Sequence, residues 1–177
     1  DGDHALAAFA LDLKRQGRLR QDTVVGTVMS NFGFEVCLRE AGIKLVRTAV
    51  GDRYILERMV ADNYNLGGEQ SGHMIFLDYH TSGDGMITGL QMLKLMQRAQ
   101  KSLSEIARCM SSTPQVLLGV KVSHKPDLKT LPQLQQAIQD KERLLNGTGR
   151  ILVRYSGTEP LLRVMVEGQD STVIQEI

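Results

Sequence analysis

Hydrophobic residues in the first 110 positions alternate between helical spacing and short continuous runs. Apolar side chains three or four residues apart predict an amphipathic helix, and a short apolar run bounded by turn residues predicts a buried strand. The expected helices cover residues 5–16, 34–41, 54–60 and 86–98, and the expected strands cover residues 24–28, 44–50 and 74–77. This alternation predicts a three-layer α/β domain with a mixed, largely parallel sheet.

The pattern changes at residues 111–115, where small polar residues and Pro114 suit a hinge linker. The elements expected beyond the linker are strands at residues 116–122, 149–155 and 161–167 and a helix at residues 131–144. Such a grouping predicts a small α+β domain with a mostly antiparallel sheet. The expected organisation is an α/β domain over residues 1–110, the linker, and a C-terminal α+β domain over residues 116–177.

Two local signals predict where helices begin. Ser102 and Glu105 have the spacing of a capping box, which favours a short helix that runs to Met110. Asp3 precedes the first helical pattern and is a suitable N-cap. The alternative, a Mg²⁺ site at Asp1 and Asp3, is weaker because two acidic residues are a poor ligand set.

Composition narrows the class of function. Lys and Arg number 21 and Asp and Glu number 20, so no net field draws the chain to nucleic acid or to an anionic membrane. No apolar run approaches the ~20 residues that a membrane span needs. We therefore expect no nucleic-acid partner and no membrane partner. Cys37 and Cys109 are too few for a disulfide framework, which favours reduced thiols and a cytoplasmic location.

The strongest local signal is a set of anion-binding residue types in a turn between two expected strands. Ser156 and Thr158 supply hydroxyl donors, and Gly157 allows neighbouring backbone N–H groups to converge. Arg154 and Arg163 flank the turn, and a guanidinium makes paired hydrogen bonds to phosphate. The pattern predicts a phosphate site. An ordinary surface hairpin with two solvated arginines explains the same residues equally well.

A second signal lies just before the expected strand at residues 74–77. Glu69, Ser71 and His73 combine a carboxylate, a hydroxyl and an imidazole within a glycine-rich stretch. A carboxylate accepts hydrogen bonds from two neighbouring sugar hydroxyls, and glycines let a ligand approach the backbone. A tight turn with a solvated carboxylate is the equally weighted alternative.

Two further stretches carry weaker signals. Gly51, Asp52 and Arg53 follow the end of an expected strand, where ligand loops occur in open α/β sheets, although a capped helix start explains them better. Ser123 and His124 place a hydroxyl beside an imidazole, but adjacent strand residues point to opposite faces, so they imply no nucleophile.

Taken together and in this order, the motifs resemble the α-D-phosphohexomutase family. The stretches that carry the resemblance are residues 27–31, 50–54, 68–73, 78–85 and 154–160. The resemblance covers essentially the whole chain and implies that it corresponds to the third and fourth domains of that family. The first two domains would then be absent, and the chain would be a piece of a longer enzyme.

The resemblance also implies a reaction. Family members are isomerases that transfer a phosphoryl group from a phosphoserine in the first domain and bind Mg²⁺ in the second. No catalytic residue and no metal ligand would then lie in this chain. The substrate would be a phosphorylated hexosamine, interconverted between glucosamine 6-phosphate and glucosamine 1-phosphate through glucosamine 1,6-bisphosphate. Gln70 beside Glu69 favours glucosamine, while mannose or glucose phosphate remains an alternative.

By the same resemblance, site residues fall into two groups. The phosphate group comprises Arg154, Ser156, Gly157, Thr158 and Arg163. The sugar group comprises Glu69, Ser71 and His73, with Gly51, Asp52 and Arg53 as neighbours. The implied partners are the substrate, the missing N-terminal domains and, as an open alternative, a second copy in a homodimer. A non-catalytic module that senses sugar phosphates is the competing class of function.

Overall fold

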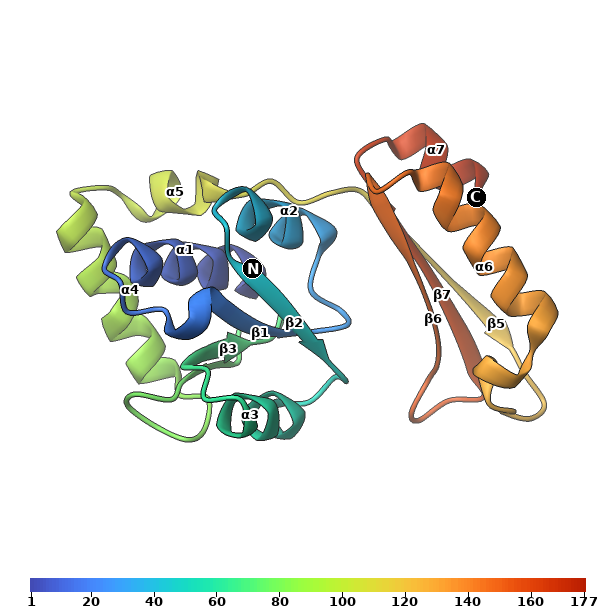
Figure 1. Ribbon diagram of the computed structural model, residues 1–177, viewed down its shortest axis with the longest axis horizontal. Coiled ribbons are helices and arrows are strands. Elements are labelled where there is room, and N and C mark those ends of the chain that lie inside the picture. Colours follow the sequence, from blue (N-terminus) through green and yellow to red (C-terminus); the bar gives the residue numbers. More distant parts are fainter. The chain divides into compact units, whose positions relative to one another are not determined.

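The computed structural model describes all residues, 1–177, and they form two compact units (Figure 1). Unit 1 is Asp1–Ser112 and unit 2 is Thr113–Ile177. Each unit has its own sheet and its own hydrophobic core. The two units are therefore described separately.

The sheet of unit 1 is mixed and mostly parallel, as expected. Its strands are β1 (Thr23–Thr27), β2 (Lys44–Thr48), β3 (Leu66–Gly68) and β4 (Met74–Phe76). They lie in the order β2-β1-β3-β4. β1 pairs in parallel with β2 and β3, and β4 runs antiparallel to β3. The hydrophobic pattern did not predict β3, because this strand is three residues long and two of them are glycines.

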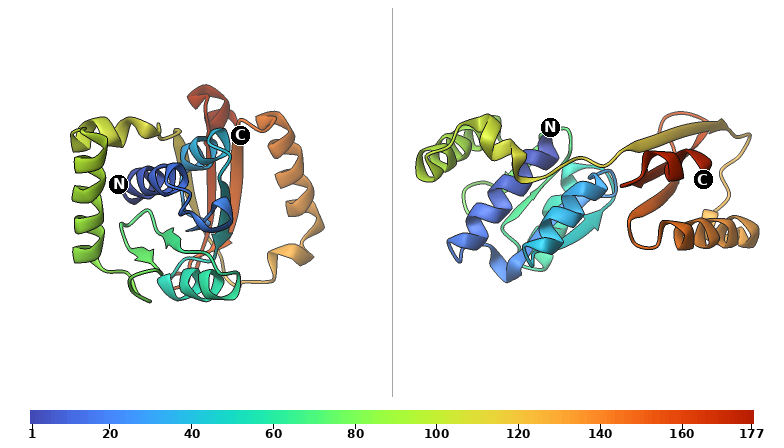
Figure 2. Two further views of the ribbon diagram at one scale, coloured as in Figure 1. Left: turned by 60° about the vertical axis from the view of Figure 1, so that its left-hand side comes forward. Right: turned by 90° about the horizontal axis from the view of Figure 1, so that it is seen from above.

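Helices cover both faces of this sheet (Figures 1 and 2). They are α1 (Gly2–Arg15), α2 (Phe32–Glu40), α3 (Asp52–Ala61), α4 (Gly85–Ala99) and α5 (Leu103–Ile106), with 3₁₀ turns η1 (Arg20–Asp22) and η2 (Ala107–Cys109). Val24 of β1 packs in the core formed with α1, α2 and α4, and Val25 packs in the core beneath α3. Consecutive strand residues point to opposite faces, so unit 1 has the expected three layers.

The first helix begins earlier than expected, and the prediction that Asp3 is its N-cap is wrong. Asp1 is the N-cap, and its carboxylate accepts from the backbone N–H of His4 at 3.3 Å. Asp3 lies in the first turn, fully buried, where its Oδ2 accepts from the backbone N–H of Asn31 at 2.8 Å. The hydrogen bond to Asn31, 28 positions away, holds the Asp3 carboxylate away from the cap position.

Caps also set the other helix boundaries in unit 1. The capping box at Ser102 and Glu105 is confirmed, with hydrogen bonds in both directions. The helix that follows is short, and η2 completes the stretch to Cys109. α2 begins two residues earlier than expected because the Asn31 side chain accepts from the backbone N–H of Gly33 at 2.9 Å.

Unit 2 is a small α+β fold with a fully antiparallel sheet, in agreement with the expected class. Its elements are β5 (Gln115–Lys121), η3 (Leu128–Thr130), α6 (Pro132–Leu145), β6 (Gly149–Tyr155), β7 (Leu161–Gly168) and α7 (Ser171–Glu176). The strand order is β5-β7-β6. Val164 and Val166 on β7 pack with Leu145 of α6 and Ile174 of α7. The helices therefore cover one face of the sheet, and the face that carries Arg163 is the other one.

Candidate functional site

The loop between β3 and β4 brings Glu69, Ser71 and His73 together in a tight turn. The backbone N–H of Glu69 donates to the carbonyl oxygen of His73 at 2.9 Å, and that of Gly72 donates to the carbonyl oxygen of Glu69 at 2.9 Å. Gly72 has a φ of +99°, a conformation that favours glycine. Residues 69–73, called the sugar loop below, are thus held by their own backbone.

Two side-chain contacts join the sugar loop to the start of α3. Glu69 Oε1 accepts from the backbone N–H of Gly51 at 3.0 Å. His73 Nε2 lies 3.4 Å from Asp52 Oδ2. Gly51 is the N-cap of α3, has a φ of +130° and offers no side chain for capping. The structure therefore brings Gly51 and Asp52 to the sugar loop, although they lie about twenty positions before it in the sequence.

Arg53 is not part of this arrangement. Its Nε donates to Glu57 Oε1 at 2.7 Å, one turn further along α3. The side chain is 82% exposed. In this structure it points along its own helix and makes no contact with the sugar loop.

Gly2 at the start of α1 supports the sugar loop from below. Its backbone N–H donates to the carbonyl oxygen of Gln70 at 2.9 Å. A Cβ atom on Gly2 would overlap the carbonyl oxygens of Glu69 and Gln70 and the nitrogen of Gly72. Only glycine fits beneath the loop, a role for Gly2 that no sequence signal indicated.

A hollow of about 420 Å³ opens beside Ser71 and His73. Its other wall is the start of α4, where Asp84 is the N-cap and accepts from the backbone N–H of Ile87 at 2.8 Å. Gly83 borders the hollow and has no room for a Cβ atom because the imidazole of His73 lies against it. The hollow has the hydroxyl, imidazole and carboxylate groups that a polyol needs.

In unit 2, the arginines that flank the turn lie directly opposite each other. Arg154 of β6 is paired with Arg163 of β7, and Arg163 is paired with Gly119 of β5 on its other side. Directly paired residues project from the same face, and like charges in such a pair repel each other. Gly119 adds no side chain to this row. The pair concentrates positive charge at the end of the sheet, which favours an anion there.

The turn between these strands, residues 156–160, is called the phosphate turn. Ser156 is buried, and its Oγ accepts from the backbone N–H of Glu159 at 3.3 Å. Gly157 and Thr158 are exposed at the tip. Glu159 Oε2 accepts from Arg163 Nη2 at 2.7 Å. A carboxylate of the protein thus occupies part of the guanidinium that was expected to bind phosphate.

Sequence reasoning missed a third cation at this turn. Lys125 Nζ donates to the carbonyl oxygen of Ser156 at 2.6 Å, from the segment between β5 and η3. The neighbouring residues Ser123 and His124 lie beyond the end of β5, so the expectation that they point to opposite faces of a strand is wrong. Ser123 Oγ lies 2.8 Å from His124 Nδ1. The available signal was a lysine in a loop that leaves the same sheet.

Two family models cover nearly the whole chain. Residues 1–113 match "Phosphoglucomutase/phosphomannomutase, alpha/beta/alpha domain III", and residues 117–177 match "Phosphoglucomutase/phosphomannomutase, C-terminal domain". The chain belongs to the phosphoglucomutase/phosphomannomutase family. The resemblance inferred from the sequence is therefore confirmed.

Relatives within this family share more than half of the sequence. The phosphoglucosamine mutase of Syntrophotalea carbinolica is 54% identical over 174 residues, which are 98% of this chain and 38% of the relative. The phosphoglucomutase/phosphomannomutase chain described here thus spans well under half the length of the curated relatives that it matches.

Solved structures of the family share the fold. The N-acetylphosphoglucosamine mutase of Aspergillus fumigatus matches with a TM-score of 0.79 at 21% identity, covering 99% of this chain and 41% of that one. A complex of that enzyme with GlcNAc-6P and magnesium matches with a TM-score of 0.75 at 20% identity, covering 99% and 45%. At this level of sequence identity, the match establishes the fold.

Across residues 1–177, no three His, Cys, Asp or Glu side chains lie together as a metal-binding group. The carboxylates of Asp1 and Asp3 accept hydrogen bonds from the backbone amides of His4 and Asn31. None of its helices combines the length and the apolar character required to span a membrane.

Proposed function

We propose that this chain supplies the sugar-binding and phosphate-binding parts of a phosphoglucosamine mutase, an isomerase that interconverts glucosamine 6-phosphate and glucosamine 1-phosphate. The observation that carries the proposal is the direct pairing of Arg154 with Arg163 beside a hydroxyl-rich turn. The repulsion between the two arginines is relieved when a dianionic phosphate accepts hydrogen bonds from both guanidinium groups. Lys125 adds positive charge beside the same turn.

The sugar loop supports the other half of the proposal. Glu69 uses one carboxylate oxygen to hold Gly51, and the second oxygen lies outside that hydrogen bond. A carboxylate oxygen in this position accepts from a ring hydroxyl, while Ser71 and His73 complete the polar lining of the adjacent hollow. Hydrogen bonds to ring hydroxyls suit a reaction in which the sugar binds in two orientations, because turning the ring exchanges similar hydroxyl groups.

The proposal assigns binding to this chain and phosphoryl transfer to other parts of the full-length enzyme. In such a mutase a phosphoserine outside this chain would donate the phosphoryl group, with glucosamine 1,6-bisphosphate as the intermediate, and bound Mg²⁺ would supply charge neutralisation. The residues of this chain position the substrate, which is a large part of catalysis in phosphoryl transfer. The 177 residues alone are therefore expected to bind the substrate without converting it.

The test is an NMR titration of the 177-residue chain with inorganic phosphate and with three sugar phosphates. Inorganic phosphate is expected to shift backbone amides of residues 154–163 and leave residues 69–73 unchanged. Glucosamine 6-phosphate is expected to shift both groups, and to bind more tightly than mannose 6-phosphate or glucose 6-phosphate. Substrate shifts confined to other residues would contradict the assignment, and equal affinity for the three sugar phosphates would contradict glucosamine specificity.

A matched pair of variants separates the two halves. Glu69→Gln is expected to weaken glucosamine 6-phosphate binding and leave inorganic phosphate binding unchanged, because it alters only the sugar loop. Arg163→Ala is expected to weaken both. Turnover by the isolated chain, with bisphosphate present and no contaminating enzyme, would contradict the division of labour proposed here.

A further inference from the structure

The two cysteines of unit 1 lie together, away from both loops. Cys37 comes from α2, and Cys109 is the last residue of η2, 72 positions later. The Cys37 thiol donates to the backbone carbonyl of Cys109 at 3.2 Å, and the Cys109 thiol lies 3.8 Å from the backbone carbonyl of His4. Neither takes part in the proposed sugar or phosphate binding.

A second contact on α2 holds the same segment in place. Gly33, one turn before Cys37, packs so closely on Ser111 that a Cβ atom would overlap the Ser111 carbonyl oxygen. Residues 109–111 therefore run along one face of α2. The contact between the cysteines is built into the packing of unit 1.

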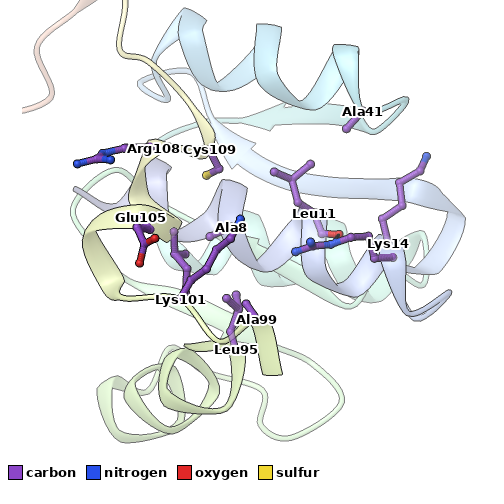
Figure 3. A pocket seen from close by; sticks show the side chains of 12 residues that line it. Ala8, Leu11, Lys14, Ala41, Leu95, Ala99, Lys101, Glu105, Arg108 and Cys109 are labelled. Carbon is purple, nitrogen blue, oxygen red and sulfur yellow. Dashed lines mark hydrogen bonds between the residues drawn. The ribbon is translucent and has the colours of Figure 1, made fainter. Parts of the chain in front are cut away.

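Cys109 also lines an open pocket of about 920 Å³ between α1, α4 and η2 (Figure 3). Ala8 and Leu11 form part of its apolar wall. Arg108 lies beside Cys109 in Figure 3. The charged residues around the pocket are mostly basic, namely Lys14, Arg15, Lys101 and Arg108, with Glu105 as the one acid. The pocket gives a small oxidant access to the Cys109 sulfur.

We propose that Cys109 and Cys37 are a peroxide-sensitive thiol pair that closes to an intramolecular disulfide. Cys109 is the attacking sulfur because it lines the open pocket, and Cys37 is the resolving sulfur because its thiol already contacts Cys109. The disulfide joins α2 to the segment that ends unit 1.

The reaction balances with hydrogen peroxide as the oxidant. The Cys109 thiol reacts with one peroxide molecule, the O–O bond breaks, and a sulfenic acid and one water form. The Cys37 thiol then attacks the Cys109 sulfur, the S–O bond breaks, and a disulfide and a second water form. Two thiols and one peroxide give one disulfide and two waters.

The ionisation of the pair agrees with these roles. The interaction with the Cys37 side chain lowers the pKa of the Cys109 thiol to about 7, while the same interaction and burial raise the pKa of Cys37. His4 of α1 also lowers the pKa of Cys109, and Glu40 of α2 raises that of Cys37. Thiolate is the nucleophile, so Cys109 is the first of the two to react.

The experiment treats the reduced 177-residue chain with hydrogen peroxide at pH 7 and then with an alkylating reagent, and measures intact mass. The expected product is a monomer that has lost two hydrogen atoms and takes up no alkyl group, and dithiothreitol restores both thiols. Two alkylatable thiols after treatment, or a disulfide formed only between two copies, would overturn the proposal.

Single variants assign the roles of the two sulfurs. Cys37→Ser is expected to accumulate a sulfenic acid on Cys109, which dimedone traps. In Cys109→Ser, Cys37 is expected to react with peroxide about tenfold more slowly than Cys109 does in the original chain, because an ordinary thiol is mostly protonated at pH 7. If Cys37 reacts at the wild-type rate in Cys109→Ser, the assignment of Cys109 as the attacking sulfur is wrong.

Discussion

Each of the two loops contains a glutamate, and the two glutamates act in opposite ways. Glu69 in the sugar loop accepts from a backbone amide of α3, so its charge helps to hold the loop in shape. Glu159 in the phosphate turn accepts from Arg163, so its charge occupies a group that is proposed to bind phosphate. The comparison predicts that the sugar loop is organised before a ligand binds, whereas a phosphate at the other turn would have to displace an internal anion.

The difference follows from the surroundings of each loop. The sugar loop lies between the starts of α1 and α3, and each of these two elements donates a backbone hydrogen bond to it. The phosphate turn connects two strands at the end of a three-stranded sheet whose opposite face is covered by helices. There, Glu159 and Arg163 hydrogen-bond to each other, while Arg154 and Lys125 contact only backbone carbonyls of the turn and its edge.

Removing Arg163 should have the largest effect on ligand binding. A hydrogen bond to a charged group contributes about 1.5–3 kcal/mol, so Arg163→Ala should lower phosphate affinity at least tenfold. Isothermal titration calorimetry with glucosamine 6-phosphate measures this. Arg143→Ala is the matched control, because Arg143 lies on α6 and its removal changes the net charge equally. Equal losses of affinity in both variants would mean that the effect comes from net charge alone.

Adding a methyl group at Gly2 should damage the sugar loop and spare the phosphate turn. The new Cβ has no room beneath Glu69 and Gln70, and overpacking of this kind costs about 1–3 kcal/mol. Urea denaturation of Gly2→Ala should show the loss in unit 1. Gly89→Ala is the control, since Gly89 lies in α4 with open space around it and should gain about 0.5–1 kcal/mol. An unchanged free energy of unfolding in Gly2→Ala would show that the loop is less rigid than the comparison requires.

Neutralising Glu159 should strengthen phosphate binding. Exposed ion pairs are worth about 0.2–1 kcal/mol, so Glu159→Gln should raise phosphate affinity by up to about fivefold as it releases Arg163. The same titration with inorganic phosphate measures the gain. Glu142→Gln on α6 makes the same change in charge and should have a smaller effect. Weaker binding in Glu159→Gln would mean that Glu159 positions Arg163 and does not compete with the ligand.

The smallest expected effect is a pH dependence confined to unit 1. Burial raises the pKa of the Asp3 carboxyl. Above about pH 4, where Asp3 ionises in the unfolded chain, the native state holds more protons than the unfolded state. The free energy of unfolding therefore falls as pH rises from about 4 to the raised pKa. Asp3→Asn removes this decline.

Urea denaturation of both proteins across that pH range checks the prediction. The difference in stability between Asp3→Asn and the original chain should grow in favour of the variant as pH rises. Parallel pH profiles would contradict a raised pKa. Unit 2 is the internal reference, because its fully buried carboxylate, Glu167, is paired with Arg150 at 2.7 Å.

The sequence predicted the class of both units well, because most of their elements have strong hydrophobic periodicity. α4 and β1 were expected almost as they are, since each has a clear apolar face or an uninterrupted apolar run. β3 was missed because Leu66 is its only residue with a side chain larger than hydrogen. Its pairing in parallel with β1 depends on residues some forty positions away.

The residue types of the proposed site were visible in the sequence, but their contacts were not. Glu69 was proposed as a sugar ligand, and nothing local indicated that Gly51 would take one of its oxygens. Glu159 belongs to the stretch at residues 154–160 that carries the family resemblance, but its contact with Arg163 depends on the geometry of the turn. Lys125 was overlooked because its contact with Ser156 spans 31 positions. Such contacts are set by tertiary packing.

The position of Gly2 beneath residues 69–72 joins the two ends of a long stretch of chain. A ligand that binds the sugar loop stabilises the folded state of unit 1, and the start of α1 shares this stabilisation through the hydrogen bond from Gly2 to Gln70. Hydrogen exchange at the amides of Gly2 and His4 would then slow when a sugar binds almost seventy residues away in the sequence. The first turn of α1 would therefore report whether the sugar loop holds a ligand, although this turn is not part of the proposed binding surface.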